Sequence, residues 1–109
     1  MSLPIKLFEP RSTAERMLDR YGYLTKYMPI AAAEVDRLER FKLVIAMTVA
    51  GLHLTLSQAK PFNPLLGETI QAHWEDGTQA FLEHTRHHPP ITNFLLIGQG
   101  FAINGNCEV

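Results

Sequence analysis

The residue types with the clearest chemistry lie in two short segments of the chain. The first is Lys60-Pro61-Phe62-Asn63-Pro64-Leu65-Leu66-Gly67-Glu68, and the second is Glu83-His84-Thr85-Arg86-His87-His88-Pro89-Pro90. Each combines cationic or potentially cationic side chains with prolines, which stiffen the backbone and lower the ordering cost of binding. The pattern predicts a preorganised site for an anionic ligand.

In the first segment, Pro61 and Pro64 restrict the backbone, so we expect a rigid extended turn from which Lys60 and Asn63 project. Lysine offers a full charge and three donors to a phosphate, and the asparagine amide adds two donors without charge. The alternative is a tight connection in which Asn63 bonds only to its own backbone.

In the second segment, His87 and His88 are adjacent, so a regular strand would point them to opposite faces. The backbone before Pro89 is expected to be extended but irregular, which could let both rings converge. Imidazole changes charge near physiological pH, and a nearby phosphate favours its charged form. The alternative is that each ring donates to a backbone carbonyl.

Metal binding and catalysis are competing interpretations of the histidines. His84, His87 and His88 could bind zinc, but a structural zinc site needs four ligands, and neither cysteine nor a spaced histidine pair completes the set. Glu68 and Glu83 could be general bases, yet Gly-x-Ser-x-Gly, Gly-rich phosphate-loop and His-Glu-x-x-His motifs are missing. The sequence therefore predicts no metal and no enzyme; a His-dependent hydrolase or metal-binding module is the alternative.

Composition limits the class of function. The chain has 109 residues, 46% of them hydrophobic, which is enough for the core of a single domain. Its net charge of -1 lacks the basic footprint of a nucleic-acid-binding protein. The lone Cys107 supports no disulfide framework, and no signal peptide is evident at Met1. The apolar tract 41–56 falls short of the roughly 20 residues that span a bilayer. We therefore expect a cytoplasmic protein.

The first half of the chain is typical of helices. Ser12-Thr13-Ala14-Glu15 has the form of a capping box, which predicts a helix start, and Gly22 is expected to end that helix after Tyr21. A second helix is predicted from Ala31 onward. It is apolar nearly all round after Lys42, so we expect it to be buried and to end between residues 51 and 57.

The second half is typical of strands. Residues 68–74 and 78–83 flank Glu75-Asp76-Gly77, whose glycine can take positive φ, so a β-hairpin is predicted. Two further strands are expected around 93–97 and 101–104. A closed barrel that holds one small ligand needs about eight strands, so about four cannot close one.

Together the two segments resemble the signature of the oxysterol-binding protein family of lipid transfer proteins, in which Lys-Pro-Phe-Asn-Pro-x-Leu-Gly-Glu is followed by Glu-Gln-Val-Ser-His-His-Pro-Pro. Residues 3–12 and Leu38-Glu39-Arg40 also resemble family segments. The resemblance implies an α+β fold, with an N-terminal lid and helices followed by the first antiparallel strands of an incomplete lipid-binding β-barrel. Residues 1–57 would form the lid and helices, and 58–109 the headgroup motifs and first strands, within a single domain.

The resemblance also implies a function. Family members exchange sterol or phosphatidylserine against phosphatidylinositol 4-phosphate between membranes, which they contact peripherally, and no cofactor is implied. By motif position, the residues that would contact headgroup phosphates are Lys60, Asn63, His87 and His88. Pro61 and Leu65 would lie near the glycerol region or the mouth of the lipid tunnel.

The chain departs from the family pattern in places. His84, Thr85 and Arg86 stand where the signature has Gln, Val and Ser, and Phe8 replaces the first residue of an Asn-Glu-Pro triplet. Arg86 could strengthen a phosphate site or point to solvent. The family's later headgroup residues and most of its barrel would lie beyond Val109, so we expect a fragment of a longer domain.

Overall fold

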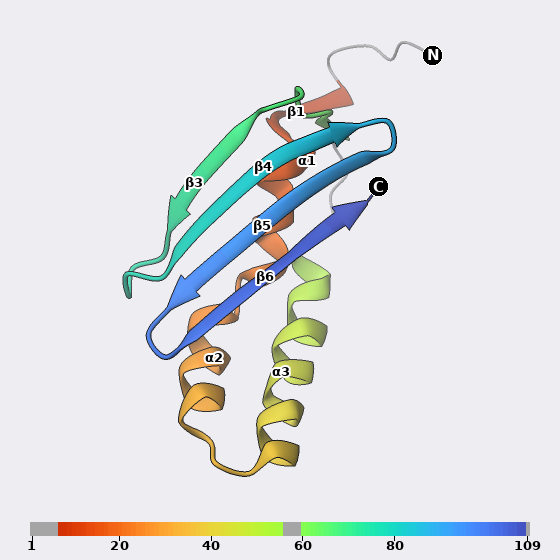
Figure 1. Cartoon of the computed structure of the whole chain (residues 1–109). Helices are drawn as coiled ribbons and strands as arrows, with labels where there is room; N and C mark the ends of the chain where they lie inside the picture. Colours follow the sequence, from red (N-terminus) through yellow and green to blue (C-terminus); the bar gives the residue numbers. More distant parts are fainter. Residues whose placement is uncertain (1–6, 56–59, 109) are drawn as a thin grey trace.

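The structure is a computed structural model that describes residues 7–55 and 60–108. Its elements are β1 Phe8–Ser12, α1 Thr13–Arg16, the 3₁₀ helix η2 Met17–Tyr21, α2 Leu24–Ala33, α3 Arg37–Gly51, the 3₁₀ helix η3 Leu52–Thr55, β2 Lys60–Phe62, β3 Thr69–His73, β4 Gln79–His87, β5 Pro90–Gly98 and β6 Phe101–Glu108. The last four strands form an antiparallel sheet in sequential order, and β1 and β2 form a separate parallel pair. Helices α1 and α2 lie behind one face of the large sheet, and the α2–α3 hairpin extends beyond it (Figure 1).

The large sheet buries one face. Along β4, Ala80, Leu82 and His84 are buried while the residues between them are exposed, as expected of a strand covered on one side. Leu96 on β5 lies opposite Ala80 and is also fully buried. These apolar side chains share one core with helix residues, namely Leu24, Met28, Ala31 and Met47.

The predicted hairpin is confirmed as β3 and β4. Gly77 in its turn has a φ of 90°, and Oδ1 of Asp76 accepts a hydrogen bond from the backbone N–H of Thr78 at 2.9 Å. The two further predicted strands are confirmed as β5 and β6, which are longer than expected and are joined at Gly100, where φ is 82°. Positive φ at both glycines favours a residue without a Cβ.

An irregularity interrupts the pairing of β4 with β5 near the end of β4. His84 lies opposite Thr92, but the next pairs are Arg86 with Ile91 and His87 with Pro90. Two steps along β4 thus match one step along β5, so one extra residue, Thr85, is inserted as a bulge. Because side chains alternate along a strand, the insertion places residues 84 and 87 on the same face.

The first helix begins as predicted. Oγ of Ser12 accepts a hydrogen bond from the backbone N–H of Glu15 at 3.3 Å. The α-helical part is one turn long and continues as η2 until Gly22. Arg11 on β1 donates two hydrogen bonds to Asp19 on η2, at 2.9 and 2.8 Å, and so ties the strand to the helix.

The prediction of one helix from Ala31 is wrong. Helix α2 begins earlier and contains Pro29, and the chain leaves the helical conformation at Glu34, where ψ is 127°. A new helix, α3, follows because Oδ1 of Asp36 caps it, accepting from the backbone N–H groups of Leu38 and Glu39 at 2.8 and 3.3 Å. Proline ahead of a helical pattern is typical of a helix start, whereas here it lies inside the preceding helix.

The prediction that this helix is buried after Lys42 is also wrong. Only Met47 and Gly51 are buried in that part of α3, whereas Ile45 and Val49 are 45% and 60% exposed. The helix packs against α2 and η2, and the hairpin extends past the sheet, so its outer face has no covering element within the described residues (Figure 1).

The fold class is confirmed: helices combine with an antiparallel sheet that does not close into a barrel within the described residues. The lid expected at the N-terminus falls partly on residues 1–6, which lie outside the described part. The parallel pairing of β1 with β2 was not predicted. No described helix has the length and apolar character needed to cross a membrane.

Candidate functional site

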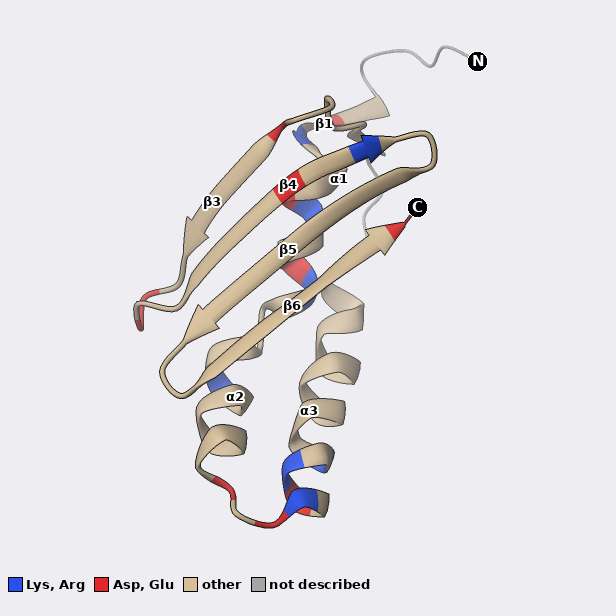
Figure 2. Ribbon diagram, viewed as in Figure 1, with Lys and Arg blue, Asp and Glu red and all other residues tan. Residues whose placement is uncertain are grey.

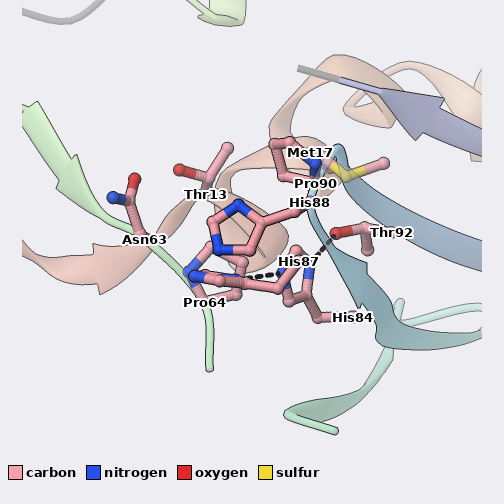
Figure 3. Close-up of a pocket in the computed structure, with 9 residues that line it drawn as sticks. All are labelled: Thr13, Met17, Asn63, Pro64, His84, His87, His88, Pro90 and Thr92. Atoms are coloured by element: carbon pink, nitrogen blue, oxygen red, sulfur yellow. Dashed lines mark hydrogen bonds between the residues drawn. The ribbon is translucent and has the colours of Figure 1, made fainter. Parts of the chain in front are cut away.

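A pocket of about 330 Å³ lies where β4 ends. Nine residues line it: Thr13, Met17, Asn63, Pro64, His84, His87, His88, Pro90 and Thr92 (Figure 3). Three of the four predicted headgroup residues, Asn63, His87 and His88, therefore share one pocket although they come from separate segments.

Pairing of β2 with β1 holds Asn63 at this pocket. The rings of Phe8 and Phe62 stack with centroids 4.8 Å apart, and the hydroxyl of Thr13 donates to the backbone carbonyl of Phe62 at 3.3 Å. Asn63 follows directly and is itself followed by the buried Pro64. The backbone is thus fixed on both sides of the Asn63 amide.

The other residues predicted from the first segment are placed differently. The backbone of Lys60 pairs with Phe8 at the start of β2, but its side chain lies outside the described part of the structure. Pro61 is half-buried in β2, and Leu65 is 74% exposed. Neither of these two lines the histidine pocket, and their roles near a glycerol region or tunnel mouth stay predictions.

The histidines form a contiguous cluster. Nε2 of His84 lies 3.2 Å from Nδ1 of His87, and the two rings meet edge to face with centroids 5.4 Å apart. The rings of His87 and His88 are 4.8 Å apart. The Thr85 bulge makes this possible, because without it the side chains of His84 and His87 would lie on opposite faces. Arg86 is exposed and does not line the pocket.

The lining of the pocket contains no carboxylate. None of its nine lining residues is Asp or Glu, although charged residues of β1 and α1 and of the end of β4 lie in the same part of the molecule (Figure 2). On β1, the hydrogen bond that Arg11 donates to Asp19 is the main reason that the pKa of Arg11 is raised above its ordinary value. A charged imidazole in the pocket has no carboxylate counter-ion in the lining, so an anionic ligand would supply it.

Sequence reasoning did not assign six pocket residues to the site: Thr13, Met17, Pro64, His84, Pro90 and Thr92. The signal for His84 was its departure from the family signature, but only strand pairing reveals its contacts. Thr92 carries no motif, and lies beside His84 because the two are opposite each other on β5 and β4.

The metal interpretation gains no support. Among residues 7–55 and 60–108, no group of three or more His, Cys, Asp or Glu side chains is arranged to hold a metal ion. Both ring nitrogens of His84 are occupied by hydrogen bonds, to Thr92 and to His87.

The fold and the sequence together define the class of protein. All 109 residues match the family model described as Oxysterol-binding protein. The chain therefore belongs to the oxysterol-binding protein family, which confirms the resemblance found in its two motifs.

Individual relatives agree with this assignment. The chain is 48% identical over 95 residues to Oxysterol-binding protein 9 of Dictyostelium discoideum, a match that covers 87% of this chain and 22% of the relative. It is 39% identical over 95 residues to Oxysterol-binding protein-related protein 6 of Homo sapiens, covering 84% of this chain and 10% of that protein. The chain thus spans about a fifth or less of these curated relatives.

Solved structures share the fold. The Osh1 ORD domain in complex with ergosterol superposes with a TM-score of 0.90 at 32% identity, covering 100% of this chain and 26% of that one. The Osh3 ORD of Saccharomyces cerevisiae in complex with PI(4)P gives a TM-score of 0.83 at 25% identity, with 99% and 29% covered.

Proposed function

We propose that this chain is part of a lipid-binding domain whose histidine pocket binds the headgroup of phosphatidylinositol 4-phosphate. The domain would exchange this lipid against sterol or phosphatidylserine between membranes that it contacts peripherally. The observation that carries the proposal is a pocket lined by three imidazoles and one amide but no carboxylate. Related domains bound to ergosterol and to PI(4)P support the two ligand classes.

The chemistry of the lining suits a phosphate monoester. The Asn63 amide and the imidazoles of His87 and His88 can donate to phosphate oxygens. Lys60, which precedes the rigid Pro61 turn, would add a full charge. A phosphate dianion in turn stabilises positive charge on neighbouring imidazoles, so binding and proton uptake would favour each other.

The test is extraction of labelled lipid from vesicles by the full-length protein. The double variant His87→Ala with His88→Ala should lose extraction of phosphatidylinositol 4-phosphate and retain extraction of sterol, because the rings contact the polar headgroup. His73→Ala is the matched control, since His73 is an exposed histidine on β3 outside the pocket. Equal loss of both ligands would indicate a folding defect, and retained phosphoinositide extraction would refute the proposal.

Lys60 gives a second test of the same site. A charged hydrogen bond contributes roughly 1.5 to 3 kcal/mol, so Lys60→Ala should weaken phosphoinositide binding about tenfold to a hundredfold. Lys26→Ala removes an exposed lysine on α2 that does not line the pocket and should change little. Unchanged binding by the Lys60 variant would remove this residue from the headgroup site.

A further inference from the structure

His84 is the most buried polar side chain of the pocket, with 1% of its surface exposed. Its Nδ1 lies 3.1 Å from Oγ1 of Thr92, and its Nε2 lies 3.2 Å from Nδ1 of His87. Thr92 is also buried, at 5% exposure, whereas His87 is exposed and lines the pocket. A buried hydrogen-bonded chain therefore runs from β5 through β4 to a ring on the ligand side (Figure 3).

Thr92 determines which atoms donate and which accept in these hydrogen bonds. Within the described part of the protein, Oγ1 of Thr92 has no hydrogen-bond partner other than Nδ1 of His84. A buried hydroxyl proton needs an acceptor, so this hydroxyl donates to Nδ1, and neutral His84 then carries its proton on Nε2. That proton is donated to Nδ1 of His87, which leaves the proton of neutral His87 on Nε2. The tautomers thus follow from the hydrogen-bond network.

From this assignment of ring protons we propose that His84 is a positioning residue for the headgroup site, an inference that rests on the proposed function. With Thr92, it fixes His87 in the tautomer whose Nε2–H is available to a phosphate oxygen. A neutral imidazole without this restraint could carry its proton on either nitrogen, and a bare Nε2 would repel the anion. The hydrogen bonds from Thr92 through His84 therefore keep Nε2–H of His87 available as a donor even when the ring is uncharged.

The same three side chains can also hold a charged ring, at the cost of leaving the Thr92 hydroxyl proton without an acceptor among the described residues. If His87 is protonated on both nitrogens, its Nδ1–H donates to Nε2 of His84, whose Nδ1–H then donates to Oγ1 of Thr92. The Thr92 hydroxyl can take either role, because a hydroxyl is both donor and acceptor. Nε2 of His87 carries a proton in both states.

Variants of His84 separate this role from simple packing. His84→Leu fills the buried site with an apolar side chain and removes the donor to His87. His84→Gln supplies an amide N–H in place of the imidazole donor. Thr92→Val keeps the shape of the side chain and removes the hydroxyl that sets the direction of the chain.

The first experiment records the ring tautomers of the full-length protein labelled with ¹⁵N-histidine, in the absence of lipid. The His87 signals are assigned from their loss in His87→Ala. We expect His87 of the unmodified protein and of His84→Gln to carry its proton on Nε2. We expect His84→Leu and Thr92→Val to give a mixture of the two tautomers, or the opposite one. An Nδ1–H tautomer in the unmodified protein, or no change in His84→Leu, would overturn the inference.

The second experiment measures binding to vesicles that contain phosphatidylinositol 4-phosphate, with soluble inorganic phosphate as a separate arm. One neutral hydrogen bond corresponds to roughly threefold to tenfold in affinity, so His84→Leu should weaken vesicle binding by about that factor. His84→Gln should recover most of the loss. Equal weakening by both variants would overturn the inference, because amide rescue would be absent.

The two experiments distinguish the inference from the function on which it rests. If the unmodified protein binds neither vesicles nor phosphate, the proposed function fails, while the tautomer of His87 still decides whether His84 positions it. If only inorganic phosphate binds, the site recognises the phosphate group without a lipid headgroup. If His87 of the unmodified protein carries its proton on Nδ1, the positioning role of His84 is refuted, whatever the result with lipid.

Discussion

Gly51, the last residue of α3, packs against the backbone of η2 at a distance that leaves no room for a side chain. A Cβ at this position would lie 1.9 Å from the carbonyl oxygen of Arg20 and 2.9 Å from its carbonyl carbon. Relief of the contact requires the two backbones to separate by about 1 Å, because protein interiors are close-packed and offer no space to absorb it. We therefore predict that Gly51→Ala destabilises the protein.

The magnitude follows from two opposing effects. Overpacking a core position costs about 1–3 kcal/mol, and a clash with backbone belongs at the upper end of that range. Alanine is favoured over glycine within a helix by up to about 1 kcal/mol, which offsets part of the cost. The net loss should be about 2 kcal/mol, or about 4–8 °C in Tm if the cooperative unit has 150–250 residues.

Gly22→Ala is the matched control. A Cβ there would meet Cδ1 of Leu54 at 2.4 Å, but that methyl group ends a flexible side chain that can turn away. Gly22 has a φ of -59°, which alanine adopts readily, so the substitution should be neutral or stabilise by up to about 1 kcal/mol. Thermal and urea unfolding of the full-length variants measure both effects. Equal melting temperatures for the two variants would refute the role assigned to the contact between α3 and η2.

Three further predictions concern the elements around the pocket. Burial raises the pKa of Tyr21 above its ordinary value of 10.0, so the stability that neutral Tyr21 contributes is present below about pH 10 and lost as pH rises above that. Tyr21→Phe should therefore flatten the decline of the urea midpoint between about pH 9 and 11, and an unchanged decline would contradict this. Arg11→Met breaks the paired hydrogen bonds to Asp19 and should lower the free energy of unfolding by about 1 kcal/mol, with a smaller loss at high salt. A loss that does not change with salt would contradict this prediction. Leu96→Ala leaves a cavity at a fully buried position and should cost about 2–5 kcal/mol in urea unfolding; a loss below 1 kcal/mol would show that the sheet core is not packed as described.

Local signals predicted the parts of the fold that depend on neighbouring residues. The Ser12 cap needs only a hydroxyl three residues before an N–H, and the β3–β4 turn needs only a glycine with positive φ at position 77. The break between α2 and α3 was missed because Pro29 was taken to precede a helix, when the competing signal was the Asp36 cap. Long-range pairing, as between β1 and β2, leaves no comparable local pattern.

The candidate site shows the same division between local and long-range information. Motif spacing predicted Asn63, His87 and His88 as headgroup donors, and these three line one pocket. Motif spacing could not show what orients the histidine side chains toward the pocket. The Thr85 bulge that does so arises from the register of β4 against β5 and becomes apparent only when both strands are paired. A proton on a histidine is placed by its partners, and the partner that decides here, Thr92, belongs to no motif. The proposed donors of this site therefore come from the two motifs, whereas the proposed direction of the hydrogen bond to His87 depends on the pairing of β4 with β5.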